Sequence, residues 1–264
     1  LILLSACATS TTAPLAEDQS PSSNPREADM GLLWVKTAAE YEAVSRQAYQ
    51  VATAHLPVFI ADTSHSALPG QTDAADLPPA VILDVDTTVL NHVDFQMSYE
   101  KPFENWKLDE YDRMNVAEPV PGVVEFLGAA LRQGVTIFLV TNRPCEPREG
   151  IDDPCPQRQT VIDSLAELGF HIPAERVLLS QERGWNREKL SRRLYVAESY
   201  RVIMLIGDDL SDFIACTRSS PRPPCTNVAT RESRLQAVRD NAGYFGNGWY
   251  ILPNPMHGSW TSAR

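Results

Sequence analysis

Short apolar runs alternate with amphipathic stretches over the middle of this 264-residue chain. Each run has the length of a buried strand, and the stretches between the runs repeat apolar residues at helical spacing. The predicted strands cover residues 80–85, 135–142, 176–180 and 201–209, and the predicted helices cover 122–133, 158–169 and 187–198. Strands that alternate with helices in this way favour an α/β fold, a Rossmann-like doubly wound parallel sheet covered on both faces.

Two segments lie outside this alternation. Residues 32–55 carry apolar and aromatic side chains at helical spacing and predict an N-terminal helix, whose aromatic stripe we assign to packing. The Gly-, Pro- and Asp-rich segment 66–79 then interrupts the chain. Residues 92–118, which follow the first predicted strand, are dense in rings and charges and too long for a simple crossover. We therefore expect a small, mostly helical cap there.

A polar cluster follows each of three predicted strands. Asp84 and Asp86 end the first, Thr141–Arg143 the second, and Gly207–Asp209 the last. The carboxyl ends of parallel strands border the functional crevice of such folds, so we expect the three clusters to meet. Asp84 and Asp86 would face the same side of an extended backbone, where two like charges need a cation or a shared proton. Polar residues are common where a strand becomes a turn, which would explain one such cluster. Polar clusters at three strand ends favour a functional site.

The composition limits the kinds of ligand. With 43% hydrophobic residues the chain can build one sizeable core, and its formal net charge is −11. Such an acidic chain binds nucleic acids poorly, so we expect no nucleic-acid partner. A phosphate-bearing ligand would need a local cation, either a metal ion or a few Lys and Arg side chains. No apolar run in the sequence reaches the length of a membrane-spanning helix.

The first residues suggest export. Leu4, Ser5, Ala6 and Cys7 resemble a bacterial lipobox, in which Cys7 becomes the lipidated first residue. The Ser-, Thr-, Pro- and Ala-rich stretch that follows is typical of a flexible tether, so we assign residues 1–28 to anchor and tether and 29–264 to the folded domain. An accidental apolar start with a free cysteine remains the alternative.

The other four cysteines form two local pairs in Pro- and Arg-rich loops, Cys145 with Cys155 and Cys216 with Cys225. An even number of cysteines in the loops of an exported protein favours disulfides, so we predict these two. A zinc site is the alternative, although it would favour closer cysteine spacing or histidine partners.

Several of these motifs together resemble the haloacid dehalogenase superfamily. The Asp-x-Asp pair, a Thr at a later strand end, a Lys that opens a helix and the Gly-Asp-Asp-x-x-x-Asp cluster occur in the order and spacing of that family's four motifs. More narrowly, the chain is similar to the class C acid phosphatases, exported bacterial lipoproteins that act on nucleotides and other phosphomonoesters. The similarity includes "AAEYEAVSRQAY", "ILDVDTTVLNHVDFQ", "IFLVTNRP", "KLSRR", "IGDDLSDF" and "LPNPMHGSW".

The resemblance implies a role for each acidic residue. Asp84 matches the nucleophile that forms an aspartyl-phosphate, and Asp86 matches the general acid/base, whose backbone carbonyl also binds the metal. Asp208 matches the remaining protein ligand, and Asp212 a carboxylate that orients it. The implied metal site therefore comprises Asp84, Asp86, Asp208 and Asp212, and such oxygen ligands select Mg²⁺. The two roles require Asp84 and Asp86 to titrate apart, with the metal favouring the charged form of Asp84.

The implied substrate-binding residues are Thr141, Asn142, Lys189 and Phe95. Thr141 would donate to phosphoryl oxygens, Lys189 would neutralise the phosphate beside the nucleophile, and Phe95 would stack on a nucleobase or another flat group. Further candidates for this stacking are Phe103, Trp106 and Tyr111 in the cap and Trp249 and Tyr250 near the end of the sequence. A turn cap for Thr141 and an exposed helix face for Lys189 remain the alternatives.

Three further residues near the motifs receive no chemical role. We expect Arg143 to be a salt-bridge partner within its loop and His92 to do no more than touch the substrate. Thr87 stands where the family usually has Glu, which leaves local hydrogen bonding and substrate preference open.

The expected function is that of a Mg²⁺-dependent acid phosphatase that hydrolyses phosphomonoesters, above all nucleoside monophosphates, as a 5′-nucleotidase. We expect a lipid anchor at the bacterial outer membrane, with the catalytic domain in the periplasm or outside, and leave a homodimer open. One alternative is a phosphotransferase on the same scaffold. The other is a non-catalytic surface lipoprotein that binds a partner through the rings of the cap, against which the complete set of site residues argues.

Overall fold

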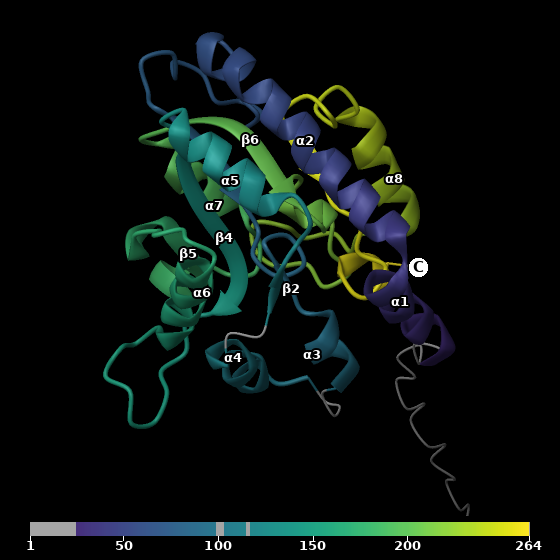
Figure 1. The fold of residues 1–264 in the computed structure, drawn as a ribbon. Helices are drawn as coiled ribbons and strands as arrows, with labels where there is room; N and C mark the ends of the chain where they lie inside the picture. The colour runs from purple at the N-terminus through teal and green to yellow at the C-terminus, as the bar shows by residue number, and fades with distance from the viewer. Residues whose placement is uncertain (1–24, 99–102, 115–116, 264) are drawn as a thin grey trace, which may run out of the picture.

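The computed structural model describes residues 25–98, 103–114 and 117–263, and its centre is a five-stranded sheet (Figure 1). The strands lie in the order β5, β4, β1, β6, β7, and every neighbouring pair is parallel. Their bounds are β1 Pro79–Leu83, β4 Thr136–Pro144, β5 Val177–Ser180, β6 Arg201–Gly207 and β7 Trp249–Ile251. The predicted α/β fold with a parallel sheet is confirmed, whereas β7 was not predicted.

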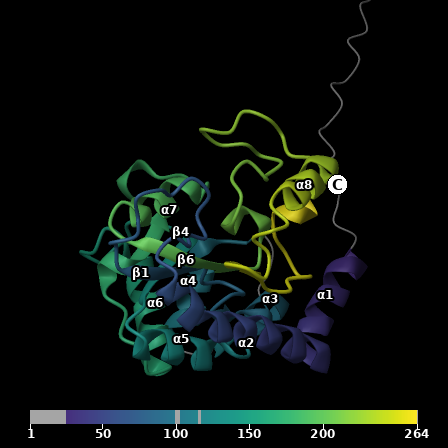
Figure 2. The ribbon, with the colours of Figure 1, turned by 90° about the horizontal axis from the view of Figure 1, so that it is seen from above.

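Helices cover both faces of this sheet (Figures 1 and 2). The helices α2 (Ala39–Ala61), α5 (Val123–Arg132) and α6 (Pro156–Glu167) pack on one face, and α7 (Leu190–Ala197) packs on the other. Because side chains alternate along a strand, Val81 and Leu83 of β1 enter the first layer, while Ala80 and Ile82 enter the second. All four are at most 4% exposed, which explains why the sequence of this strand is continuously apolar.

The predicted N-terminal helix is two helices, α1 (Pro25–Thr37) and α2. Ala38, between them, has an extended backbone with φ −82° and ψ 127°, which ends the first helix and caps the second. Tyr41 and Tyr49 of α2 are buried, so the aromatic stripe serves packing as expected. α1 begins within the stretch 1–28 that the sequence assigns to the tether, and Cys7 lies outside the described residues. Over the residues described, no helix combines the length and the apolar character that crossing a membrane needs.

The segment expected to form a cap leaves the domain through a short two-stranded sheet. β2 (Leu90–Asn91) pairs antiparallel with β3 (Glu118–Pro119), and α3 (Val93–Ser98) and α4 (Asn105–Arg113) lie between them in the chain. α4 packs against α6, and α3 packs against α1. Figure 1 shows both helices below the end of the sheet to which β4 points.

In the described ranges, the remaining helices are α8 (Arg231–Asp240) and four 3-10 turns, η1 Ala174–Arg176, η2 Glu182–Gly184, η3 Leu210–Asp212 and η4 Ser259–Thr261. Two disulfides close the loops beside them. Cys145–Cys155 joins the segment after β4 to the start of α6, and Cys216–Cys225 closes the loop after η3. Both predicted pairs are confirmed, and such bonds are typical of a domain outside the reducing cytoplasm.

Candidate active site

A cavity of about 410 Å³ opens where β1, β4 and β6 end. Asp84 and Asp86 line it from the loop after β1, Asn142 and Arg143 line it from the end of β4, and Asp208 follows β6. The sequence-predicted strand-end clusters therefore meet, as expected for the carboxyl edge of a parallel sheet. Other lining residues come from the cap, from the loops around α7 and η3, and from the end of the chain: His92, Phe103, Arg187, Lys189, Asp212, Arg218 and His257.

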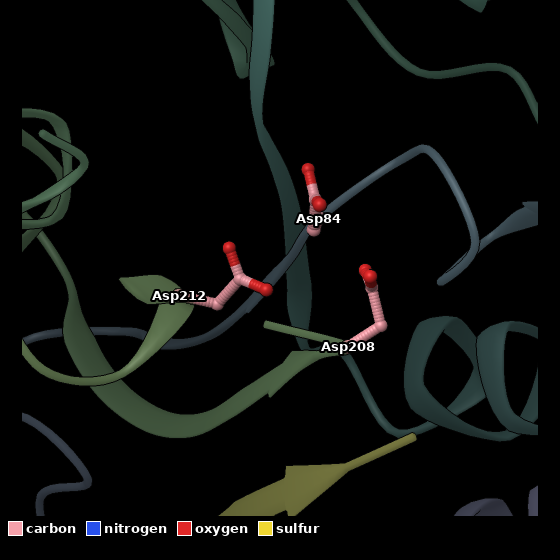
Figure 3. Close-up of side chains that lie close together, drawn as sticks. All are labelled: Asp84, Asp208 and Asp212. Atoms are coloured by element: carbon pink, nitrogen blue, oxygen red, sulfur yellow. The ribbon is translucent and has the colours of Figure 1, made fainter. Parts of the chain in front are cut away.

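Three carboxylates gather at the base of this cavity. Asp84, Asp208 and Asp212 each offer an oxygen, and these oxygens lie within 4.8 Å of one another (Figure 3). In Figure 3 the side chains come from the chain after β1, from the end of β6 and from η3, and their carboxylates approach a common space. The backbone N–H of Asp84 donates to the carbonyl of Ile206 at 3.0 Å, which continues the pairing of β1 with β6 and brings the acidic residues together.

The carboxylate of Asp208 is held by two donors. The Thr88 hydroxyl donates to its Oδ1 at 2.9 Å, and the Asn254 amide donates to its Oδ2 at 2.7 Å. Each oxygen keeps a lone pair for another partner, because a carboxylate oxygen accepts more than one bond. Asp208 is thus oriented as a ligand of a cation would be.

Lys189 lies between two members of the acidic cluster. Its Nζ is 2.6 Å from Asp84 Oδ1 and 2.7 Å from Asp212 Oδ1. Lys189 is only 3% exposed, so it does not lie on an exposed helix face, which was the alternative for this residue. The second oxygen of Asp212 accepts the backbone N–H of Asp209 at 2.9 Å. Both oxygens of Asp212 are therefore engaged by the protein, which suits a residue that orients its neighbours.

The charges of this cluster do not balance. Burial raises the pKa of Asp84 to about 7, against the opposing effect of Lys189 and with the help of the Asp212 charge. Burial, together with the Asp212 and Asp84 charges, also raises the pKa of Asp208 well above its ordinary value. Burial opposes the charge of Lys189, but Asp212 and Asp84 hold its pKa above the usual value. The cluster thus holds three carboxylates and one lysine, which pairs with two of them, and hard oxygen donors of this kind fit a divalent cation such as Mg²⁺.

Asp86 has a separate set of partners. Arg143 Nη2 lies 2.6 Å from Asp86 Oδ1, Arg143 Nε lies 3.2 Å from Oδ2, and His92 Nδ1 lies 3.3 Å from Oδ1. Although burial opposes ionisation, Arg143 and His92 hold the pKa of Asp86 below its usual range. Without a cation, the two aspartates therefore titrate apart, with the pKa of Asp84 raised and that of Asp86 lowered, whereas the expected order is that of the metal-bound site. A cation beside Asp84 would favour the charged form of that residue.

Arg143 does more than pair within its loop. It is 4% exposed, and its Nη1 forms a second ion pair with Asp112 of α4 in the cap. His92 Nε2 is 2.8 Å from the same carboxylate. Asp112 was not predicted as a site residue, because nothing in the local pattern of α4 distinguishes it from the other acidic residues of the cap.

Thr141 and Asn142 are positioned at the end of β4. Thr141 is fully buried; its hydroxyl donates to Asp86 Oδ2 at 3.4 Å and accepts the backbone N–H of Arg143 at 3.2 Å. Asn142 lines the cavity, and its Oδ1 accepts a hydrogen bond from Arg192 Nη2 at 2.9 Å. With this oxygen engaged, the amide of Asn142 keeps N–H donors for a ligand oxygen.

The aromatic side chain that lines the cavity is Phe103, one of the further candidates, and not Phe95. Phe95 is 3% exposed and packs against the rings of Phe103 and Tyr111, with centroid distances of 6.2 Å and 5.4 Å. Phe103 is 44% exposed and lines the cavity. Trp249 and Tyr250, also considered as platforms, are buried in β7. A flat ligand would therefore meet Phe103, with Phe95 beneath it.

The end of the chain contributes residues that sequence reasoning gave no role. Asn254 follows β7, holds Asp208 and accepts the backbone N–H groups of Met256 and His257 at 3.0 Å and 3.2 Å. His257 lines the cavity, and its Nε2 is 3.3 Å from the hydroxyl of Thr87. Thr87, which replaces the usual Glu, has a left-handed backbone with φ 65°. Recognising β7 would have revealed this segment, because it too follows a strand of the sheet.

Comparison with known proteins agrees with this geometry. Residues 4–260 match the family model described as HAD superfamily, subfamily IIIB (acid phosphatase). The class C acid phosphatase from Bacillus anthracis has a similar structure, with 27% sequence identity and a TM-score of 0.69 over 90% of this chain and 87% of that one. A structure of the Bacillus anthracis class C acid phosphatase with tungstate bound gives 28% identity and the same TM-score and coverage.

Proposed function

This chain belongs to the acid phosphatases of haloacid dehalogenase subfamily IIIB and is a phosphomonoester hydrolase, and we propose that it works through an aspartyl-phosphate on Asp84 with Mg²⁺ as cofactor. The observation that carries the proposal is the contact of Asp84 with Lys189 inside a cluster of three carboxylates. A carboxylate nucleophile repels a phosphate dianion unless nearby cations offset the two negative charges. Lys189 is one such cation, and the three carboxylates could bind a divalent ion as the second.

Asp84 attacks phosphorus and forms the aspartyl-phosphate, while the ester oxygen leaves with a proton. Lys189, 2.6 Å from Asp84, neutralises charge on the transferring group. Asn142 lines the cavity and offers N–H donors to the phosphoryl oxygens. Thr141 supports this end of the cavity through Asp86, to which its hydroxyl donates at 3.4 Å.

Asp86 is the general acid and base of this proposal. In the first step it gives a proton to the leaving alcohol, and in the second it takes one from the water that attacks the aspartyl-phosphate. Arg143 and His92 favour its carboxylate form, which is the form that activates water. The negative charge of a bound phosphate acts in the opposite direction and favours the protonated form that the first step needs.

The metal would be held by the carboxylates of Asp84 and Asp208 and by the backbone carbonyl of Asp86, with Asp212 orienting the site. When bound, Mg²⁺ would offset the charge of the phosphoryl oxygens and of the nucleophile. The hydrogen bonds from Thr88 and Asn254 to Asp208 support this assignment, because metal-binding carboxylates are usually fixed by such neighbours.

Nucleoside monophosphates are the proposed substrates. The exposed ring of Phe103 at the cavity, with Phe95 and Tyr111 behind it, supports a flat leaving group such as a nucleoside. The neighbour with tungstate bound supports the binding of a tetrahedral oxyanion by this fold. The chain would act at the outer membrane through a lipid on Cys7, in keeping with its two disulfides.

A phosphate-release screen tests the proposal. Purified protein is incubated at acidic pH with nucleoside monophosphates, sugar phosphates and p-nitrophenyl phosphate, each with Mg²⁺ and with EDTA. We expect nucleoside monophosphates to give the highest kcat/KM and EDTA to remove the activity, which Mg²⁺ then restores. Equal activity with EDTA would contradict the metal assignment, and a preference for sugar phosphates would contradict the substrate assignment.

A further inference from the structure

Two arginines line the active-site cavity without a carboxylate partner in the part of the chain that the structure describes. Arg187 lies in the loop before α7, and Arg218 lies in the loop that follows η3. Among the described residues, Arg187 makes no ion pair or side-chain hydrogen bond. Arg218 donates from Nη2 to the Ser211 hydroxyl at 2.7 Å, while its buried Nε has no hydrogen-bond partner. The guanidinium groups therefore keep donors for a ligand.

The other cations of the cavity are already paired. Lys189 contacts Asp84 and Asp212, and Arg143 contacts Asp86 and Asp112. The positive charge of Arg187 is instead opposed by its surroundings: partial burial, and then the charges of Arg218 and Arg222, lower its pKa. The whole chain has a net charge of −11, yet these guanidinium groups lie near one another without an acidic partner. Their mutual repulsion costs free energy, and a bound anion would offset it.

Side-chain to backbone hydrogen bonds hold the loops of these two arginines together. Asn186 Nδ2 donates to the carbonyl of Pro223 at 2.7 Å, and Glu188 Oε2 accepts the backbone N–H of Cys216 at 3.3 Å. The Cys216–Cys225 disulfide closes the second loop on itself. The residues on both sides of Arg187 are thus bonded to the loop that carries Arg218, so the pair is arranged before any ligand arrives.

We propose that Arg187 and Arg218 bind a second phosphate group on the substrate, so that phosphomonoesters with another phosphate on the leaving group are preferred over simple monoesters. The proposal rests on the proposed function, which places the reacting phosphoryl group at Asp84 and Lys189. Arginine fits this role because its planar fork pairs with two phosphate oxygens at once. The cavity of about 410 Å³ is in the range of pockets that enclose whole small molecules, so it has room for more than one phosphoryl group.

The test measures binding apart from turnover. An Asp84→Asn background prevents phosphoryl transfer, and isothermal titration calorimetry in the presence of Mg²⁺ gives Kd for adenosine 5′-monophosphate and for adenosine 3′,5′-bisphosphate. We expect the bisphosphate to bind about tenfold more tightly or better, the size expected from one charge-assisted hydrogen bond. Adding Arg187→Ala and Arg218→Ala should bring the two Kd values together.

Arg222→Ala is the matched control. It removes the same charge from the same disulfide loop, but Arg222 is exposed and does not line the cavity. The tenfold difference should survive in this variant. Equal Kd values for the two ligands in the Asp84→Asn background would overturn the proposal. So would the Arg222→Ala variant if it reduced the difference between the two Kd values as much as the Arg187→Ala and Arg218→Ala substitutions do. The preference would then come from the overall positive charge of the loop and not from direct contacts of Arg187 and Arg218. Failure of the proposed function would instead appear as absence of phosphate release from any monoester by the wild-type protein.

Discussion

His92 Nε2 lies 2.8 Å from Oδ1 of Asp112, a buried carboxylate on the cap helix α4. The other oxygen of Asp112 pairs with Arg143. His92 and Arg143 both contact Asp86, so this one cap residue holds the two partners of the proposed acid/base. A buried network of charged side chains therefore connects the cap to Asp86. Because its members share partners, the loss of one is expected to change the positions of the others.

Asp112→Asn should impair substrates that need a proton on the leaving group more than substrates that do not. We expect kcat/KM for a nucleoside monophosphate to fall about tenfold further than kcat/KM for p-nitrophenyl phosphate, since a misplaced Asp86 loses part of its acid/base contribution. Asp109→Asn is the control: Asp109 lies on the same helix, is equally buried, and pairs with Arg148 away from the cavity. A uniform loss for both substrates in Asp112→Asn would mean that its role is structural only.

Asp86→Asn should separate the two halves of the reaction. The amide keeps the backbone carbonyl for the metal but cannot move a proton, so breakdown of the aspartyl-phosphate becomes slow. With p-nitrophenyl phosphate, whose leaving group needs no acid, rapid mixing should show a burst of p-nitrophenol of about one equivalent per site. Linear release from the first turnover would exclude slow breakdown of the intermediate.

The metal-free protein should lose stability as the pH rises towards neutrality. Burial raises the pKa of Asp84 from 3.8 to about 7, so the folded state binds more protons than the unfolded state between these values. The stability due to this group is thus fully present below about pH 4 and is lost as the pH rises through about 7. We expect Tm in EDTA, measured relative to Asp84→Asn, to fall from pH 5 to pH 8. If the difference in Tm between the two proteins stays constant or rises from pH 5 to pH 8, the pKa of Asp84 is not raised in the folded protein.

Asp208→Asn should raise the Mg²⁺ concentration that gives half-maximal activity by about tenfold or more, because one charged oxygen ligand is lost. Asp209→Asn is the matched control. Its carboxylate accepts from Ser211 and Ser259, and those bonds hold its pKa down to about 2 despite burial. This variant should lower Tm without changing the Mg²⁺ requirement. The assignment fails if the two variants need the same Mg²⁺ concentration.

Cys7→Ser, made in a full-length precursor, should release active enzyme from the membrane into the soluble fraction. The several acyl chains of a lipidated N-terminal cysteine are enough to hold a domain at a bilayer, and the serine variant cannot carry them. Fractionation followed by a phosphatase assay measures the distribution. Retention of the variant in the membrane fraction would show that Cys7 is not the anchor.

The sequence by itself determined the alternation of strands and helices and the acidic clusters at the strand ends. It could do so because both are local: Val81, Leu83 and their neighbours are apolar in one continuous run, and Asp84 follows that run directly. The edge of a parallel sheet then brings Asp84 and Asp208 together without further information. The disulfides were predictable for the same reason, since each joins cysteines within one loop.

Other features depended on contacts between segments that are distant in the chain. β7 was missed because three residues give too short a pattern, and its pairing with β6 is what places Asn254 beside Asp208. The choice of Phe103 over Phe95 as the exposed ring followed from how the cap packs on itself. Ion pairs such as Arg143 with Asp112 were not predictable, because the pattern of a surface helix does not say which of its acidic residues another segment will bury. Only the tertiary structure decides burial and charge neighbours, and these set the pKa values and the free donors of the site.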